Sequence, residues 1–164
     1  MPSDLIGQPR TRAQAALASD AWQAHMMPLL QPRPGAMATL AKVVERKLRV
    51  GLISDCADEI PRMWGDLPYR RFIDAPVFSC REGMTKPDPE IYERCCERLG
   101  VKPPEVLYVG DTAREVQGAL DAGLGGAVRI LAPHESDTSH YWADRSPWDG
   151  PTIEALPDLL PYLD

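Results

Sequence analysis

The sequence has few residues of the kinds that mark secreted, membrane-bound or metal-clustered proteins. Its four cysteines form no CxxC pair and its three histidines are scattered, which argues against a zinc site. No apolar run approaches the roughly 20 residues that span a bilayer. The stretch MPSDLIGQPRTR at the start lacks the hydrophobic core of a signal peptide. We therefore expect a cytoplasmic protein whose cysteines are free, core or half-buried thiols.

Positive charge is not in excess either. The net charge is −6 and the isoelectric point is near 5.1, which argues against a nucleic-acid or anionic-membrane surface. The composition, 44% hydrophobic and 26% charged, is that of an ordinary soluble globular protein. A chain of 164 residues is long enough for one domain with a substantial core.

Strand-like apolar runs and helix-like periodicities alternate along the chain. Helices are expected at 11–30, 35–48, 58–64, 88–99, after Asp111, and in a short closing segment at 152–164; strands are expected at 49–54, 75–79, 106–109 and 127–131. Such alternation with short connections predicts an α/β fold, a three-layer sandwich with a mostly parallel sheet. The stretch 132–151 is polar and long for a loop, and Trp142 and Trp148 are expected to fold back onto the body.

One strand ends on a carboxylate. The run LYVGD stops at Asp111, and TAREVQGALDAG continues as a helix with Thr112 as N-cap and with Val116, Ala119 and Leu120 on one face. This places Asp111 at the strand end and Glu115 one turn into the helix. Mg²⁺ needs only one or two protein carboxylates besides water and phosphate oxygens, so this pair is a candidate magnesium site.

Two further polar groups are expected at the same edge of the sheet, where ligands bind in open α/β folds. Ser54 closes its strand and could offer a hydroxyl to a phosphate oxygen. Lys86, in TKPDPEIY, could neutralise charge on that phosphate. Taken singly, each has an ordinary alternative: a turn serine, an exposed lysine, or an Asp111 that only caps a helix.

Together, VGLIS, TKPDPEIY and YVGDTARE resemble the motifs of the haloacid dehalogenase-like (HAD) hydrolases, in this order and context. In that family a lysine in a KPDP-type turn and a later GD…D/E motif serve phosphoryl transfer. The resemblance implies a HAD-like, Rossmann-like sheet, a phosphatase-type activity on a small phosphorylated metabolite, and Mg²⁺ as cofactor. It assigns Ser54 and Lys86 to phosphate binding, and Asp111 and Glu115 to the metal.

The resemblance covers roughly residues 32–130. Residues 1–31 look like the remnant of the helical cap that many members insert, and residues 32–164 like the core domain. Two positions depart mildly from the family pattern: Asp55 stands where Asn is commoner, and Glu115 where Asp is commoner. Both substitutions keep the side chain polar or charged.

The family's nucleophile is not found. It is the first Asp of a DxDx[T/V] motif that ends the first strand, and nothing before Ser54 matches that pattern. The nearest candidates, Asp55 and Asp58, have DxxD spacing. Without this carboxylate, covalent phosphoryl transfer lacks its first step. We therefore expect a truncated HAD domain that is weakly active or inactive alone.

The missing strand has a structural consequence. In the family it lies centrally, between the strands that end at Ser54 and Asp111, so its absence predicts a gap of one strand. Either the two flanking strands close up, the N-terminal segment fills the gap, or another chain supplies the strand. Two alternatives stay open for the function: a non-catalytic module that binds a phosphorylated ligand or a protein, and one half of a split enzyme. Either a homodimer or a complementing chain is the expected partner, because unpaired strand edges recruit other strands.

Overall fold

The computed structural model describes residues 11–132 and 146–163 of the chain. The helices are α1 (Arg12–Leu29), α2 (Ala36–Glu45), α3 (Glu59–Met63), α4 (Ser79–Glu82), α5 (Pro89–Leu99) and α6 (Ala113–Asp121). The 3-10 helices are η1 (Trp64–Asp66), η2 (Pro68–Phe72), η3 (Pro103–Glu105) and η5 (Leu156–Leu163). The strands are β1 (Gly51–Ser54), β2 (Ala75–Phe78), β3 (Leu107–Gly110), β4 (Gly126–Ile130) and β5 (Thr152–Ile153).

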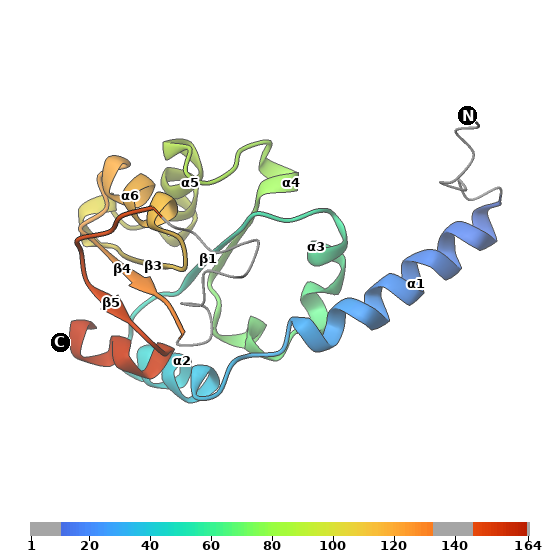
Figure 1. Cartoon of the computed structure of the whole chain (residues 1–164), viewed down its shortest axis with the longest axis horizontal. Coiled ribbons are helices and arrows are strands. Elements are labelled where there is room, and N and C mark those ends of the chain that lie inside the picture. Colours follow the sequence, from blue (N-terminus) through green and yellow to red (C-terminus); the bar gives the residue numbers. More distant parts are fainter. Residues whose placement is uncertain (1–10, 133–145, 164) are drawn as a thin grey trace.

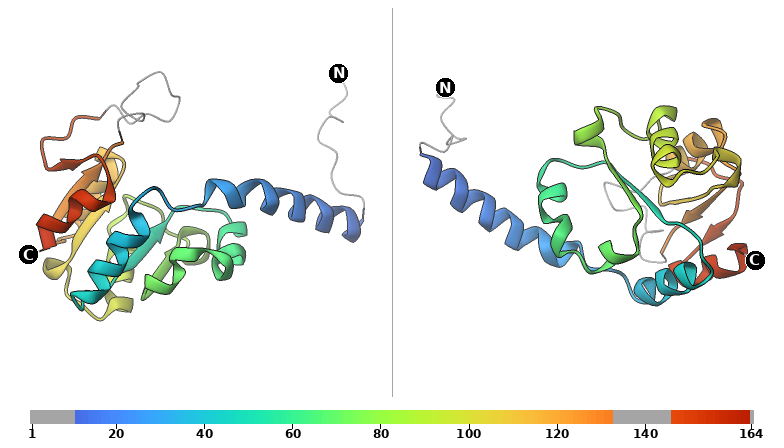
Figure 2. Two further views of the ribbon diagram at one scale, coloured as in Figure 1. Left: turned by 90° about the horizontal axis from the view of Figure 1, so that it is seen from below. Right: turned by 180° about the vertical axis from the view of Figure 1, so that it is seen from behind.

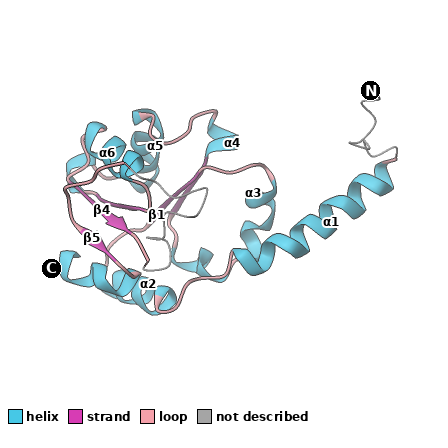
Figure 3. Ribbon diagram, viewed as in Figure 1, coloured by secondary structure: helices cyan, strands magenta, loops and turns pink. Residues whose placement is uncertain are grey.

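The strands form two separate parallel sheets, of order β1-β2 and β3-β4-β5. Figure 3 shows the strands in magenta among the helices. Ser54 pairs with Phe78 in the first sheet, and Gly110 pairs with Arg129 in the second. Every strand pair is parallel, as the alternation of helices and strands predicts. The predicted α/β class is therefore confirmed, and the sheet is divided between β1 and β3.

Two hydrophobic clusters lie on opposite faces of the strands and account for the layering. The larger joins β2 to α5 and α6 through fully buried residues such as Val77, Ile91 and Ala119. The smaller joins Val128 of β4 to Ile153 and to Leu159 of η5. Figure 1 shows α5 and α6 together on one side of the strands, and α2 beside the C-terminal η5. Because successive side chains of a strand point to opposite faces, both layers are needed to cover it.

Local sequence explains the ends of the helices that border the sheet. Pro89 occupies the first turn of α5, where its missing N–H costs nothing, and Gly100 ends that helix in the left-handed conformation at φ 64°. Thr112 caps α6, its side chain accepting from the backbone N–H of Glu115 at 3.2 Å. Thr112 is thus the N-cap that the sequence predicts.

Several expectations need correction. The closing segment 152–164 begins with the short strand β5, followed by the 3-10 helix η5 rather than an α-helix. In α6, Val116 and Ala119 are fully buried but Leu120 is 38% exposed, so it does not share their face. Trp148 donates its ring N–H to the carbonyl of Pro151 at 3.0 Å. Trp142 lies outside the described residues.

Helix α1 projects from the body (Figures 1 and 2). It meets the rest of the structure at its C-terminal end, against α3. This is the part of the chain that resembles a cap remnant. None of the helices within the described ranges combines the length and the apolar character that a membrane crossing requires.

Candidate active site

Lys86 and Glu115 form an ion pair beside the carboxyl ends of the strands. Lys86 Nζ lies 3.1 Å from Glu115 Oε1, and the two side chains are only 12% and 16% exposed. Mostly buried charges of this kind are rare unless they are paired. The pairing brings the turn before α5 to the first turn of α6, two segments separated by the whole of α5 and β3.

Asp55 and Asp111 lie around this pair. The backbone N–H of Lys86 donates to Asp55 Oδ1 at 3.2 Å, so the residue after β1 holds the lysine turn. Arg129 of β4 donates to the backbone carbonyl of Asp111 at 3.1 Å and fixes the end of β3. Burial raises the pKa of Glu115, Lys86 opposes that rise, and the charges of Asp111 and Asp55 add to it. The three carboxylates therefore share one electrostatic environment with Lys86.

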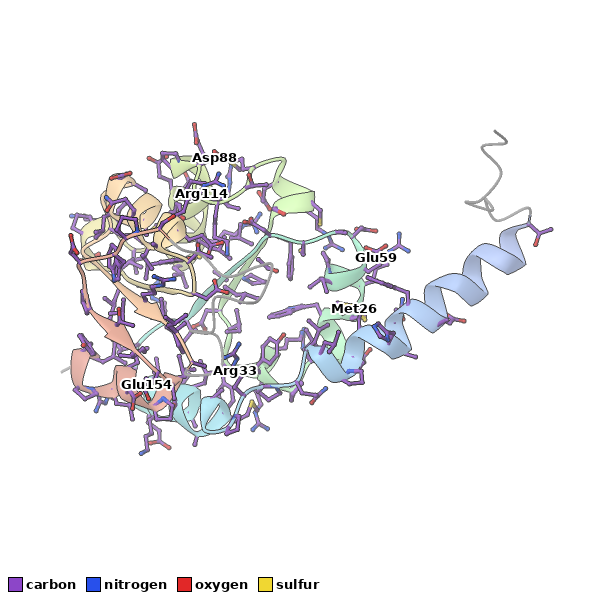
Figure 4. The ribbon with its side chains drawn as sticks, in the orientation of Figure 1. Met26, Arg33, Glu59, Asp88, Arg114 and Glu154 are labelled. Atoms are coloured by element: carbon purple, nitrogen blue, oxygen red, sulfur yellow. The ribbon has the colours of Figure 1, made fainter. Side chains whose placement is uncertain are left out.

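Ser54 lies at the end of β1, beside a pocket of about 360 Å³. Trp22 and Met26 of α1 line one side of this pocket, and Trp64 and Tyr69 also line it. Met26 and Glu59, both lining residues, come from neighbouring helices (Figure 4). The pocket therefore has aromatic and apolar walls next to the polar end of β1.

The residues present fit a divalent cation in part. Glu115 Oε2 is buried and has no hydrogen-bond partner among the described residues. A buried carboxylate oxygen without a partner is costly, and a hard cation would satisfy it. Within residues 11–132 and 146–163, no group of three or more His, Cys, Asp or Glu side chains is gathered for a metal. Mg²⁺ can accept so few protein ligands, because water and phosphate oxygens complete its shell.

The structure thus brings Lys86 and Glu115 into contact and places Asp111 within electrostatic reach of Glu115. Ser54 lies at the end of the neighbouring strand β1, on the wall of the pocket. The roles assigned to these four residues from the sequence stay predictions.

Two supporting residues were not found by reading the sequence. Gly118 packs against the lysine turn: a Cβ built there would lie 2.4 Å from Pro87 Cβ and 2.9 Å from the Pro87 carbonyl oxygen. Tyr92 of α5 donates its hydroxyl to the backbone carbonyl of Glu115 at 2.9 Å. A glycine inside a helical pattern is the one signal that could have pointed to Gly118, because it destabilises a helix by about 1 kcal/mol relative to alanine.

The chain thus has a polar, partly buried cluster at the carboxyl ends of its parallel strands. This is the edge of the sheet at which open α/β proteins bind ligands. The family model of the haloacid dehalogenase-like hydrolases matches residues 8–123. The chain belongs to this family, as the motifs around Ser54, Lys86 and Asp111 indicate.

Two similar proteins are phosphatases. The chain is 30% identical over 128 residues to the N-acetylmuramic acid 6-phosphate phosphatase of Pseudomonas aeruginosa, covering 75% of this chain and 55% of the relative. It is 42% identical over 99 residues to the N-acylneuraminate-9-phosphatase of Mus musculus, covering 57% of this chain and 37% of the relative. The chain thus spans about half, or less, of the length of these relatives.

A solved structure shows the same fold. The HAD phosphatase from Thermococcus onnurineus superposes with a TM-score of 0.69 at 22% identity, covering 87% of this chain and 64% of that one. At this identity the likeness establishes the architecture alone.

Proposed function

We propose that the chain is the phosphate- and Mg²⁺-binding part of a phosphatase that acts on a small phosphorylated metabolite. The observation that carries the proposal is the ion pair of Lys86 with Glu115, at 3.1 Å and mostly buried at the strand-end edge. A lysine held there can meet a phosphoryl group with a full positive charge. In phosphoryl transfer, positioning and charge stabilisation supply most of the catalysis.

Each predicted site residue has a distinct part in this proposal. Lys86 binds the phosphate, and Ser54 offers its hydroxyl to another phosphate oxygen. Asp111 and Glu115 would hold Mg²⁺, with the unpartnered Glu115 Oε2 as one donor. When bound, the ion would neutralise negative charge on the phosphoryl oxygens. Asp55 keeps the lysine turn at the end of β1 through its hydrogen bond to the Lys86 N–H.

The pocket beside Ser54 would receive the organic part of the substrate. Its walls include Trp22, Trp64 and Tyr69. Aromatic walls suit the apolar face of a sugar ring or a short carbon chain. Two relatives are named N-acetylmuramic acid 6-phosphate phosphatase and N-acylneuraminate-9-phosphatase, and they support a phosphorylated sugar or sugar acid as the substrate. We assign residues 1–31 to a cap segment, 32–164 to the core domain, and the protein to the cytoplasm.

Turnover by the chain alone should be low, because its 164 residues contain no DxDx[T/V] segment to supply the nucleophile. A carboxylate from outside these 164 residues would be needed, and in the split-enzyme alternative it lies on a separate chain. A purely binding role is the competing reading, and the two differ in whether a complementing segment restores turnover.

The test combines calorimetry with a phosphate-release assay on the purified chain, using N-acetylmuramic acid 6-phosphate with and without Mg²⁺. We expect Mg²⁺-dependent binding that Lys86→Met and Asp111→Asn abolish, and phosphate release close to background. Arg62→Met is the matched control, because Arg62 pairs with Asp58 on the surface. Absence of binding would refute the proposal. Robust turnover that Asp111→Asn removes would show a nucleophile within the chain, with Asp55 tested next.

A further inference from the structure

Cys56 and Cys80 follow neighbouring strands at the carboxyl ends of the first sheet. Ser54 and Phe78 are register partners at the last positions of β1 and β2, and each cysteine comes two residues after its strand. Paired strands lie about 4.8 Å apart, and a disulfide joins Cα atoms about 4.4–6.8 Å apart. The two segments therefore leave the sheet with a spacing that a disulfide can bridge.

Hydrogen bonds keep these two segments together beyond the strands. The Ser79 hydroxyl accepts from the backbone N–H of Cys56 at 3.0 Å and donates to the carbonyl of Cys56 at 3.3 Å. Ser79 is buried and directly precedes Cys80 in α4. The Cys56 thiol is itself hydrogen-bonded with the side chains of Ser54 and Cys80. The two thiols are therefore neighbours, and a buried hydroxyl fixes the backbone of one beside the other.

The four cysteines of the chain differ in their access to reagents. Cys80 is exposed and Cys56 is half-buried, and burial is the main cause that raises the pKa of Cys56. Cys95 and Cys96 are buried in the larger hydrophobic cluster, and burial raises the pKa of both thiols. Reactivity of a thiol follows its exposure and its ionisation. A reagent should therefore meet Cys80 first, with Cys56 next to it and the other two thiols out of reach.

We infer that Cys56 and Cys80 form a redox-active dithiol, which low-molecular-weight disulfides convert into an intrachain disulfide. In the first step the Cys80 thiolate attacks one sulfur of the small disulfide, and the other sulfur leaves as a thiolate. In the second step Cys56 gives up its proton and attacks the Cys80 sulfur, which releases the second small thiolate. The two cysteines thus lose two protons and two electrons, and the small disulfide leaves as two thiols.

This modification site borders the candidate active site. The new bond joins α4 to the segment after β1, in which Asp55 holds the lysine turn through the Lys86 N–H. Cys56 also lines the pocket of about 360 Å³. The ring that the bond closes contains α3, η1, η2 and β2, and with them Trp64 and Tyr69 of the pocket wall. The proposed function uses neither thiol, so the inference does not depend on it.

The test incubates the full chain with oxidised glutathione, without Mg²⁺ or phosphate, and counts the remaining thiols after acid quenching and denaturation. We expect the count to fall from four to two, with the Cys56–Cys80 bond identified by peptide mass spectrometry and reversed by dithiothreitol. Cys96→Ser is the matched control and should form the same bond, because Cys96 is buried.

Two variants separate the two steps of the reaction. Cys56→Ser should stop at the glutathione adduct of Cys80, because the second thiol is missing. Cys80→Ser should lose thiols at least about tenfold more slowly than the unmodified chain, because its remaining thiols are buried or half-buried.

The inference is wrong if the unmodified chain keeps four thiols, retains a glutathione adduct on Cys80, forms a disulfide with Cys95 or Cys96, or dimerises through Cys80. Because the bond is mapped in the unmodified chain, the result does not depend on how well the serine variants fold. Calorimetry of the reduced chain with N-acetylmuramic acid 6-phosphate and Mg²⁺ tests the proposed function separately, so failure of one leaves the other standing.

Discussion

The two halves of the sheet end in different surroundings. After β3 the chain enters α6 at once, and Thr112 caps the helix that carries Glu115. After β1 the chain runs through Asp55 along an open pocket, held by contacts from distant segments. The part of the site at the end of β3 is therefore determined by residues that are neighbours in the sequence. The part at the end of β1 depends on long-range contacts.

The largest effect is expected where the lysine turn contacts α6. Gly118→Ala places a Cβ 2.4 Å from Pro87 Cβ, and we expect it to lower the free energy of unfolding by about 2–3 kcal/mol. This opposes the ~1 kcal/mol that alanine normally adds to a helix. Gly65→Ala, with nothing within 4 Å, is the control. Chemical denaturation measures the free energy of unfolding of both variants. A Gly118→Ala variant that is more stable than the unmodified chain would contradict the close contact.

The second prediction compares the same valine-to-alanine substitution in an outer strand and in an inner strand. Val128 of β4 is fully buried and Val109 of β3 is half-buried, and both belong to the same cluster. Val128→Ala should cost about 2 kcal/mol, from two lost methyl groups plus a cavity, and Val109→Ala about half of that. Urea denaturation of both variants measures the difference. Equal costs would mean that the inner strand is already covered.

The third prediction concerns the positive charge of Lys86, which lies between the ends of β1 and β3. Lys86→Met leaves the mostly buried Glu115 unpaired and should cost about 1–2 kcal/mol, discounted from the 3–5 of fully buried pairs. Arg62→Met, which breaks an exposed pair with Asp58, should cost under about 0.5 kcal/mol. Thermal unfolding at matched pH and salt compares them. If both variants lose the same stability, the Lys86 pair behaves as a surface pair.

The smallest effect is expected at the cap. Thr112→Ala removes the side-chain acceptor for the N–H of Glu115 and should cost about 1 kcal/mol. Thr112→Ser keeps the hydroxyl and should restore most of the loss. A serine variant as unstable as the alanine variant would point to the lost methyl group instead of the hydrogen bond.

The sequence predicts the elements whose determinants are local. The strand ending before Asp111, the cap at Thr112 and the parallel α/β order all follow from periodicity and from residues a few positions apart. What it misses depends on tertiary contacts. Leu120 looks like a core residue by spacing, but α6 turns it outward. β5 is too short to show a period, and it forms because β4 offers Arg129 and Ile130 as partners.

For the site, the sequence names the four candidate residues but not what holds them. Nothing local indicates that Asp55 accepts from the Lys86 N–H, or that Gly118 leaves room for Pro87, since each contact joins segments about 30 residues apart. The backbone contact of Tyr92 with Glu115 is equally non-local. Such contacts are decided by how α5 and α6 pack together, which no single stretch of sequence encodes.

A single site for metal and phosphate, formed by Lys86, Asp111 and Glu115, is the core of the proposed function. Its most direct test is a titration with Mn²⁺ as a paramagnetic probe for Mg²⁺, followed by electron paramagnetic resonance with and without inorganic phosphate. We predict that phosphate tightens Mn²⁺ binding in the unmodified chain, because ligands at a shared site are linked reciprocally. That enhancement should vanish in Lys86→Met, and Mn²⁺ binding itself should vanish in Asp111→Asn. Mn²⁺ binding that is insensitive to phosphate and unchanged in Asp111→Asn would contradict the account.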